Sequence, residues 1–261
     1  MRAFSLTALA LALAMPGAAM AKPAPHAAAS GTADVAAAVA APGRPADMVK
    51  LDAVRKPVEV LRFAGLKRGD MVLDVIAGSG YYTEIMARAV GPRGGVLAYQ
   101  PPAFMTDKAR TAWAELKQRA PNTGVLSTAL GAFSLPASTF DFVMIHLNYH
   151  DIYWESAKFG FPRMDPDAIL RTVYQATKPG GVVAVIDHVA NPGGDTRAVV
   201  DQLHRIDPAV VKADFQRAGF VLEGESNLLR NPADDHTKLV FDPSIRGNTD
   251  RVVYRFRKPR K

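Results

Sequence analysis

The sequence contains no cysteine among its 261 residues. This absence excludes disulfide bonds, thiolate nucleophiles, thiolate metal sites and lipid attachment through an N-terminal cysteine. The chain also has no excess of charge, since charged residues make up 22% and hydrophobic residues 48%. A chain of this composition can bury a core, so global disorder is excluded. Its length fits one large domain, or one domain with extensions.

The sequence also lacks an excess of positive charge along most of its length. The net charge is +7, but residues 251–261 alone carry six basic residues and no acidic one, so the rest is nearly balanced. A nucleic-acid-binding face would spread its cations over a folded surface. We therefore expect no nucleic-acid partner and interpret the C-terminal tail as a solvated basic end, with contact to an anionic surface as the alternative.

No apolar run near the N-terminus reaches the roughly 20 residues that span a bilayer. The uncharged, apolar run from Ala3 to Met15 follows Arg2 and precedes the small-residue pattern Ala19-Met20-Ala21. This order is typical of a cleaved signal peptide over residues 1–21. It predicts an exported protein, periplasmic or secreted, without stable membrane insertion after cleavage; an uncleaved anchor is the alternative.

The remaining chain divides into a linker and a domain. Residues 22–46 are rich in alanine and proline without a sustained amphipathic period, which favours a flexible linker. Residues 47–261 alternate strands with helices, which indicates an α/β domain: a Rossmann-like, doubly wound, mostly parallel seven-stranded sheet with helices on both faces. The expected strands are 71–76, 95–99, 125–130, 140–147, 182–186, 220–223 and 252–256.

The turn after the first expected strand is the most informative segment. Gly78-Ser79-Gly80 allows a sharp turn and a close approach of backbone to ligand. A nicotinamide site would need a third glycine, where Thr83 stands, and an acid after the second strand, where Gln100 stands. Asp74 lies inside the first strand, and its burial costs free energy unless its oxygens are paired.

The pattern D-x-x-x-G-x-G from Asp74 to Gly80, with Lys178-Pro179-Gly180-Gly181 before the fifth strand, resembles the class I S-adenosylmethionine-dependent methyltransferases. The resemblance covers about residues 50–258. It is strongest to a group of exported methyltransferase-like proteins, on the segments 78–83, 204–207, 229–235, 241–243 and 246–247.

The resemblance implies S-adenosylmethionine as the cofactor. The residues that it places against the cofactor are Asp74, Gly78, Ser79, Gly80, Tyr82, Gln100 and Asn148. Two departures from the family pattern stand out: Gln100 replaces the acid that grips ribose, and Leu130-Gly131-Ala132-Phe133 lacks the acid often found near adenine. Of Tyr81 and Tyr82, one is expected to cover the cofactor and the other to lie in the core.

Acid–base residues follow the fourth and fifth expected strands. The candidate catalytic residues are His150, Asp151, Asp187 and His188. Methyl transfer to a hydroxyl or amine needs alignment and removal of a proton, and His150 is the best candidate for the base. His146 is interpreted as a core residue. We expect no metal site, because no H-E-x-x-H motif accompanies these histidines.

Two functions remain open from the sequence. The first is an S-adenosylmethionine-dependent methyltransferase acting on a small molecule. The second is an exported binding protein or pseudoenzyme that kept the fold without catalysis. Two charged clusters, at residues 204–207 and 230–236, form either an ion network that closes a loop or a solvated surface.

Overall fold

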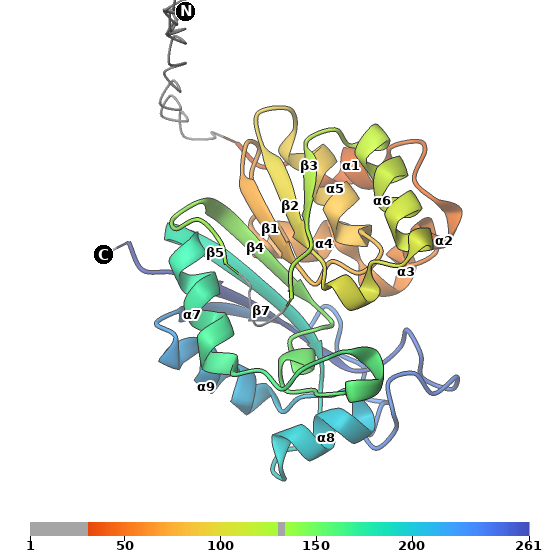
Figure 1. Ribbon diagram of the computed structural model, residues 1–261, viewed down its shortest axis with the longest axis vertical. Coiled ribbons are helices and arrows are strands. Elements are labelled where there is room, and N and C mark those ends of the chain that lie inside the picture. Colours follow the sequence, from red (N-terminus) through yellow and green to blue (C-terminus); the bar gives the residue numbers. More distant parts are fainter. Residues whose placement is uncertain (1–30, 130–133, 261) are drawn as a thin grey trace, which may run out of the picture.

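The computed structural model describes residues 31–129 and 134–260 (Figure 1). The expected signal peptide, residues 1–21, lies outside these residues. Within them, no helix combines the length and the apolar character needed to cross a membrane.

The described residues form a seven-stranded sheet with the order β3-β2-β1-β4-β5-β7-β6. Neighbouring strands from β3 to β5 run parallel, whereas β7 runs antiparallel to both β5 and β6. The expected mostly parallel, seven-stranded fold is therefore confirmed. The strands are β1 (Met71–Val75), β2 (Gly95–Tyr99), β3 (Thr123–Leu126), β4 (Phe140–His146), β5 (Thr177–His188), β6 (Val221–Ser226) and β7 (Arg251–Arg257).

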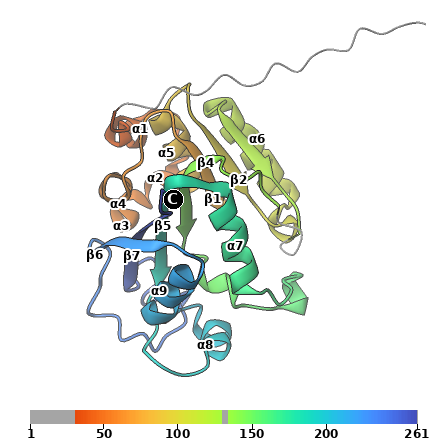
Figure 2. The same cartoon turned by 90° about the vertical axis from the view of Figure 1, so that its left-hand side faces the viewer.

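Helices cover both faces of the sheet (Figures 1 and 2). The α-helices are α1 (Val35–Ala40), α2 (Ala46–Val49), α3 (Asp52–Arg55), α4 (Pro57–Ala64), α5 (Tyr81–Val90), α6 (Asp107–Arg119), α7 (Pro166–Ala176), α8 (Thr196–Leu203) and α9 (Pro208–Arg217). Three short 3₁₀ helices are η1 (Pro102–Phe104), η3 (His150–Ile152) and η4 (Ala157–Phe159).

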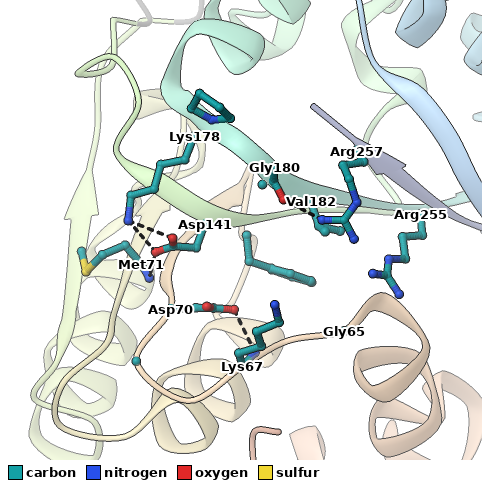
Figure 3. Close-up of a pocket in the computed structure, with 14 residues that line it drawn as sticks. Gly65, Lys67, Asp70, Met71, Asp141, Lys178, Gly180, Val182, Arg255 and Arg257 are labelled. Atoms are coloured by element: carbon teal, nitrogen blue, oxygen red, sulfur yellow. Dashed lines mark hydrogen bonds and ion pairs between the residues drawn. The ribbon is translucent and has the colours of Figure 1, made fainter. Parts of the chain in front are cut away.

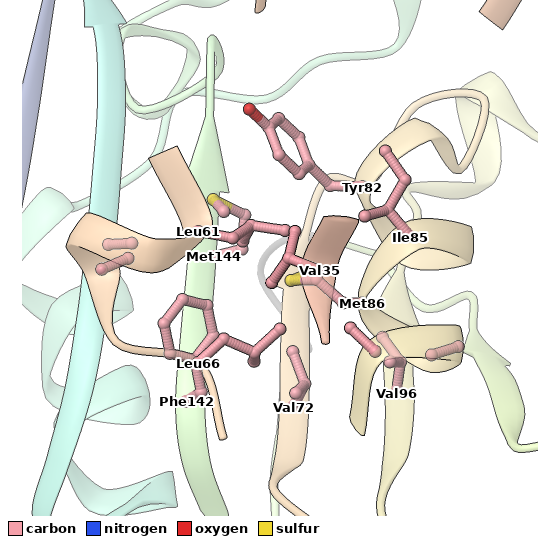
Figure 4. Packing of buried hydrophobic residues seen from close by; sticks show 14 of the residues in the cluster. Val35, Leu61, Leu66, Val72, Tyr82, Ile85, Met86, Val96, Phe142 and Met144 are labelled. Atoms are coloured by element: carbon pink, nitrogen blue, oxygen red, sulfur yellow. The ribbon is translucent and has the colours of Figure 1, made fainter. Parts of the chain in front are cut away.

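Alternation along the strands creates two cores. Val72 and Phe142 point to the face covered by α1, α4, α5 and α6 (Figure 4), whereas Leu73 and Val143 point to the face covered by α7 and α9. Successive strand side chains point to opposite faces, so strands buried on both faces read as continuous apolar runs. This arrangement brings the carboxyl ends of β1, β2, β4 and β5 to one edge of the sheet.

The segment expected to be a flexible linker, residues 22–46, is folded over its described part. Helix α1 begins at a cap in which Asp34 accepts the Ala37 N–H at 3.0 Å, and Val35 and Ala38 are buried in the core. Arg44 is buried and pairs with Asp52 at 2.7 Å. Because six mostly alanine residues give almost no hydrophobic period, the sequence pattern could not reveal this helix.

The C-terminal basic segment also differs from a solvated tail over much of its length. Arg251 is buried, and Arg255 and Arg257 both lie 2.7 Å from the Glu223 carboxylate. Residues 251–257 form β7 inside the sheet, so the strand expected there is confirmed and its cations are partly neutralised. Residues 178–181, expected to precede the fifth strand, lie within β5.

A polar cavity of about 240 Å³ lies at the amino ends of β1 and β4, away from the edge described below (Figure 3). Asp141 accepts from the Met71 N–H at 2.9 Å and pairs with Lys178 at 2.8 Å. Asp70 accepts from the Lys67 N–H at 2.8 Å, yet burial raises the pKa of its carboxyl to about 6. This edge carries structural ion pairs and no candidate catalytic residue.

Candidate active site

The chain bends sharply where β1 and β4 end at the carboxyl edge. Ile76 has φ 51° and Leu147 has φ 58°, in the left-handed region that non-glycine residues rarely adopt. Such strained positions gather at binding and catalytic sites. Here they turn the chain outward, so that the polar residues which follow each strand gather above the sheet.

The glycine turn has two glycines with different roles. Gly78 has φ 58°, its N–H donates to Gln100 Oε1 at 2.9 Å, and a methyl group added to it would meet open space. Gly80 has φ 79°, but a methyl group there would collide with Leu116 and Trp113 of α6. Gly78 thus borders open space, whereas Gly80 permits packing of the turn against α6. The expected close approach of a ligand to Gly80 is therefore corrected, because Leu116 and Trp113 occupy the space beside it.

Asp74 and Thr83 form a buried pair beneath the turn. Thr83 Oγ1 donates to Asp74 Oδ2 at 2.6 Å, and burial raises the pKa of Asp74 to about 7. Thr83, which replaces the third glycine of a dinucleotide motif, therefore supplies the partner that a buried carboxyl needs. The pair fixes the first turn of α5 against β1.

A cap made of α2 and α3 covers the glycine turn from the N-terminal side. Asp52 accepts from the Tyr81 hydroxyl at 2.7 Å, and Ser79 Oγ lies 3.8 Å from Met48 Sδ. The Arg55 guanidinium lies 4.5 Å from the centre of the Tyr81 ring, and burial lowers its pKa. Among the described residues, Arg55 has no acidic partner within 4.0 Å. Sequence analysis missed this residue because its segment shows no motif.

Arg55 lines a small cavity with unpartnered polar atoms. Asn148 Nδ2 donates to the carbonyls of Val75 and Ile76 at 2.8 and 2.9 Å, which leaves Oδ1 without a partner. His146 Nε2 also has none, and burial lowers the pKa of this imidazole far below its usual range. The cavity measures about 20 Å³ and is lined by Arg55, Asp74, Ile76, Ala77, Tyr81, Tyr82, His146 and Asn148. Unpaired buried polar groups of this kind indicate a ligand site.

Tyr81 and Tyr82 both lie against this cavity and are buried. The Tyr82 ring packs edge-on against His146 with centroids 4.6 Å apart, and the Tyr81 hydroxyl is held by Asp52. The expectation that one tyrosine covers the cofactor and the other lies in the core is therefore corrected. Both tyrosines contribute to the cavity wall and to the core.

A wider, mostly apolar cavity lies past the end of β2. It measures about 400 Å³ and is lined by Pro101, Pro102, Ala103, Ala129, Ser156, Ala157, Gly160, Phe161 and Pro162. Gln100, directly before it, is buried and holds Gly78. The segment 130–133, where the family acid near adenine is missing, lies outside the described residues.

Three of the four candidate catalytic residues meet at Asp187. Its Oδ1 lies 2.7 Å from His150 Nδ1, and it accepts the backbone N–H of both His150 and His188, at 2.8 and 2.7 Å. Burial lowers the pKa of His150, but the carboxylates of Asp187 and Asp151 outweigh it and raise the pKa to about 9. A base with this pKa is mostly protonated at neutral pH, so the base role of His150 stays a prediction.

The free side of His150 faces Asp151 and a histidine that sequence analysis did not assign. His150 Nε2 lies 3.3 Å from Asp151 Oδ1, and His204 Nδ1 lies 3.5 Å from the same oxygen. His188 instead meets Thr249 through Nδ1 at 2.7 Å, and burial lowers its pKa. His204 sits in the segment His204-Arg205-Ile206-Asp207, which was the only sequence signal for it.

These side chains open onto a third cavity, which we call the acceptor pocket. It measures about 390 Å³ and is lined by Phe104, Leu147, His150, Asp151, Trp154, Phe159, His188, His204, Val240 and Phe241. Phe159 and Phe241 are about half exposed, at 50% and 53%. An apolar wall with a few convergent polar groups suits a small, largely apolar molecule.

The two charged clusters of the C-terminal third form an ion network. Arg205 is fully buried and pairs with Asp234 at 2.9 Å. Asp250 binds Arg230 at 2.8 Å and lies 2.9 Å from His236 Nε2. Asp207 caps α9 by accepting the Ala209 N–H. The network holds the loop that carries Val240 and Phe241 to the acceptor pocket.

Comparison with known proteins agrees with this arrangement. Residues 73–185 match the family described as "Methyltransferase domain". The ubiquinone/menaquinone biosynthesis C-methyltransferase UbiE of Escherichia coli is 27% identical over 193 residues, covering 72% of this chain and 63% of that protein. The corresponding protein of Pasteurella multocida is 26% identical over 143 residues, covering 55% of this chain and 46% of that protein. The chain thus matches about half to two-thirds of the length of these relatives.

Solved structures share the fold. A SAM-dependent methyltransferase from Aquifex aeolicus has a TM-score of 0.56 and 22% identity, over 82% of this chain and 98% of that one. A putative sarcosine dimethylglycine methyltransferase from Galdieria sulphuraria has a TM-score of 0.57 and 16% identity, over 82% and 88%. These findings support S-adenosylmethionine as the cofactor. The chain therefore has the class I methyltransferase fold, with a methyltransferase domain matched over residues 73–185.

Proposed function

We propose that this chain transfers a methyl group from S-adenosylmethionine to a small, largely apolar acceptor. The observation that carries the proposal is the ligand side of the glycine turn. There Gly78 leaves space, Asn148 Oδ1 and His146 Nε2 lack hydrogen-bond partners, and the Arg55 guanidinium, which lies over the Tyr81 ring, lines the same cavity. These groups lie at the carboxyl ends of β1 and β4, where α/β sheets bind ligands.

The residues present fit the cofactor chemically. S-adenosylmethionine supplies an activated methyl group on a sulfonium. Its amino-acid end carries one carboxylate and one ammonium, which match the Arg55 guanidinium and Asn148 Oδ1. The apolar cavity that begins at Pro101 suits its adenine. A cavity of about 20 Å³ is too small for the amino-acid end, so the side chains of Arg55 and Tyr81 must move when it binds.

The acceptor belongs in the acceptor pocket, beside His150 and Asp151. Apolar walls from Phe104, Trp154 and Phe241 bind its hydrocarbon surface and exclude water. The polar floor holds the oxygen or nitrogen that loses a proton. The names of the UbiE relatives, which are quinone-biosynthesis C-methyltransferases, support an apolar ring as the acceptor class.

A screen of ligands and acceptors tests this function. S-adenosylmethionine and S-adenosylhomocysteine should each raise the melting temperature of the protein, whereas NAD should not. A ligand at 100 times its dissociation constant adds about 2.7 kcal/mol. Labelled cofactor should then pass label to one of a set of phenols, quinols, amines and thiols. Absence of both effects would favour the alternative, a binding protein without catalysis.

We also propose that the protein is exported by the signal peptide expected at residues 1–21. Its support is the sequence pattern alone: Arg2, the apolar run and Ala19-Met20-Ala21. An exported methyltransferase has to obtain a cofactor that is made in the cytoplasm. Mass spectrometry of ligands that remain bound through native purification would identify what the protein carries.

A further inference from the structure

The strongest unexplained feature is the group formed by His150, Asp151 and His204, called here the His–Asp–His cluster. One ligand atom from each of these residues lies within 4.8 Å of the other two. Asp151 Oδ1 lies 3.3 Å from His150 Nε2 and 3.5 Å from His204 Nδ1. Both contacts are longer than the 2.7 Å hydrogen bond between His150 and Asp187.

The two contacts of Asp151 have the separation expected between ligands that share one metal ion. Imidazole nitrogens and carboxylate oxygens bind Zn²⁺ at about 2.0–2.2 Å, so two such ligands at a tetrahedral angle lie about 3.4 Å apart. The two shorter distances in the cluster agree with this spacing. Two imidazoles and one carboxylate are also a ligand set that zinc, iron(II) and related divalent ions favour.

Asp187 prepares His150 for this role. The carboxylate accepts from Nδ1, so Nε2 is the nitrogen left to bind an ion once it loses its proton, and it faces Asp151 and His204. Metal-binding histidines usually have such a carboxylate or carbonyl behind them. Asp187 is itself fixed, because it is fully buried and accepts the backbone N–H of both His150 and His188.

His204 is also held in place. It ends α8 with φ 50°, a left-handed conformation that favours glycine. Its ring packs against Trp154 and Phe241, each with ring centroids 5.2 Å away. A left-handed backbone and two aromatic neighbours thus keep a polar ring next to Asp151.

The charge balance favours a cation at this point. Asp151 and Asp187 lie close to the same imidazole, and neither has a lysine or arginine within 4.0 Å in the described part of the chain. The nearby Arg205 is committed to Asp234. Two carboxylates thus face one imidazole, and a bound divalent ion would neutralise more of their charge than one imidazolium does.

We propose that His150, Asp151 and His204 bind one divalent transition-metal ion, with its open coordination position facing the acceptor pocket. Three protein ligands and an open position are typical of catalytic rather than structural metal sites. Metal binding does not depend on the proposed function. The role of the ion in catalysis does rest on the proposed function: in a methyltransferase, an ion here would hold the oxygen of the acceptor and lower the pKa of its hydroxyl group.

Metal binding can be measured on the full chain without a polyhistidine tag, after treatment with a chelator. Calorimetric titration with Zn²⁺ should give one ion per chain, and Co²⁺ should give the visible absorption of a low-coordinate site. Asp151→Asn and His204→Phe should each weaken Zn²⁺ binding at least tenfold. Asp187→Asn should weaken it about 10–100-fold, although Asp187 does not contact the ion. Glu115→Gln, which changes an exposed carboxylate on α6 outside the cluster, should bind as the parent does.

The inference is overturned if the parent binds neither ion, or if the cluster variants bind Zn²⁺ as tightly as the parent. Thermal melting without metal checks that each variant folds. Asp151→Asn is the safest variant, because it keeps the shape of a side chain that is 19% exposed. S-adenosylhomocysteine binding, measured on the same sample, separates the two proposals: cofactor binding without Zn²⁺ binding removes only the metal site.

Discussion

Asp187 holds His150 through both its ring and its backbone, with Oδ1 2.7 Å from Nδ1 and Oδ2 2.8 Å from the backbone nitrogen. Asp187 comes from the end of β5 and His150 from the loop after β4, so the contact ties together two neighbouring strand ends. Because the ring is fixed on one side, its Nε2 is presented to the acceptor pocket. This relationship makes His150 the most constrained polar group at the candidate site.

Replacing His150 by alanine should lower turnover by about 10²–10⁴-fold once an acceptor is known. The affinity for S-adenosylhomocysteine should change little, because the acceptor pocket and the cavity beside Gly78 are lined by different residues. Steady-state kinetics and calorimetry check the two parts. Glu115→Gln, at an exposed position of α6, is the control variant. Unchanged turnover in His150→Ala would remove this residue from the mechanism and leave Asp187 or His188 as the preferred base.

Asp151→Asn separates two roles for its carboxylate. If Asp151 binds the proposed ion, turnover should fall about as far as in His150→Ala. If it only orients the imidazole, the loss should be clearly smaller, since Asp187 already fixes the ring. The ratio of kcat values for the two variants is the measurement, and we expect it to be close to one.

Arg55→Met tests the cavity beside the glycine turn. Methionine keeps the length and apolar stem but removes a partly buried cation that has no acidic partner within 4.0 Å among the described residues. The stability of the ligand-free protein should stay the same or rise. S-adenosylhomocysteine should bind about 10–100-fold more weakly, from the loss of one or two charge-assisted hydrogen bonds.

The matched ligand for this variant is 5′-methylthioadenosine, which has the nucleoside but no amino-acid carboxylate. Its affinity should be equal for the parent and Arg55→Met. An equal loss of affinity for both ligands would mean that the substitution disturbs the whole site. That result would contradict a role of Arg55 in carboxylate binding.

The structure also predicts a pH dependence of stability at the opposite edge of the sheet. Asp70 is 6% exposed, and burial raises its pKa from an ordinary 3.8 to about 6. The Asp70 carboxyl therefore loses its proton at a lower pH in the unfolded chain than in the folded protein. Its ionisation lowers the free energy of unfolding as the pH rises from about 4 to 6. Two pKa units correspond to about 3 kcal/mol at most.

Asp70→Asn should remove that loss while keeping an acceptor for the Lys67 N–H. Urea unfolding at pH 4 and pH 8 is the measurement, and the variant should gain on the parent only at pH 8. Glu115→Gln, at an exposed position within α6, is the control and should differ from the parent equally at both values. A gain for Asp70→Asn that is the same at both pH values would contradict the account.

Processing of the N-terminus gives a further prediction that is independent of the site. Cleavage after Ala21 should leave Lys22 as the first residue of the exported protein. The intact mass of protein recovered from outside the cytoplasm decides this. A mass that retains residues 1–21 would contradict the signal peptide.

Much of the sheet could be predicted from the sequence, because strands buried on both faces are continuous apolar runs. The bounds of β2 were predicted to the residue, and those of β1 and β4 to within one. Local sequence signals also mark the start of α7, where Asp165 caps the helix and Pro166 takes its first position. Helix α1 could not be predicted, because its alanines have no period and only Val35 and Ala38 are buried.

The sequence predicted only the parts of the candidate site whose residues directly follow a strand. The residues directly after β1, β4 and β5 follow from the rule that parallel strands end at one edge. Arg55 and His204 reach the site from α3 and α8, which no motif marked. Gly80 was misjudged because a glycine pattern does not tell whether the space is needed by a ligand or, as here, by Leu116.

The central claim is that S-adenosylmethionine binds beside Gly78, and two glycine substitutions test it most directly. Gly78 and Gly247 both have left-handed φ, 58° and 84°, and a methyl group on either meets open space, so Gly→Ala imposes a similar backbone cost of about 1 kcal/mol. The measurement is calorimetric titration of the parent, Gly78→Ala and Gly247→Ala with S-adenosylhomocysteine. We expect one bound ligand for the parent and Gly247→Ala, and at least tenfold weaker binding for Gly78→Ala. Equal affinities for all three proteins, or no binding by the parent, would contradict the account.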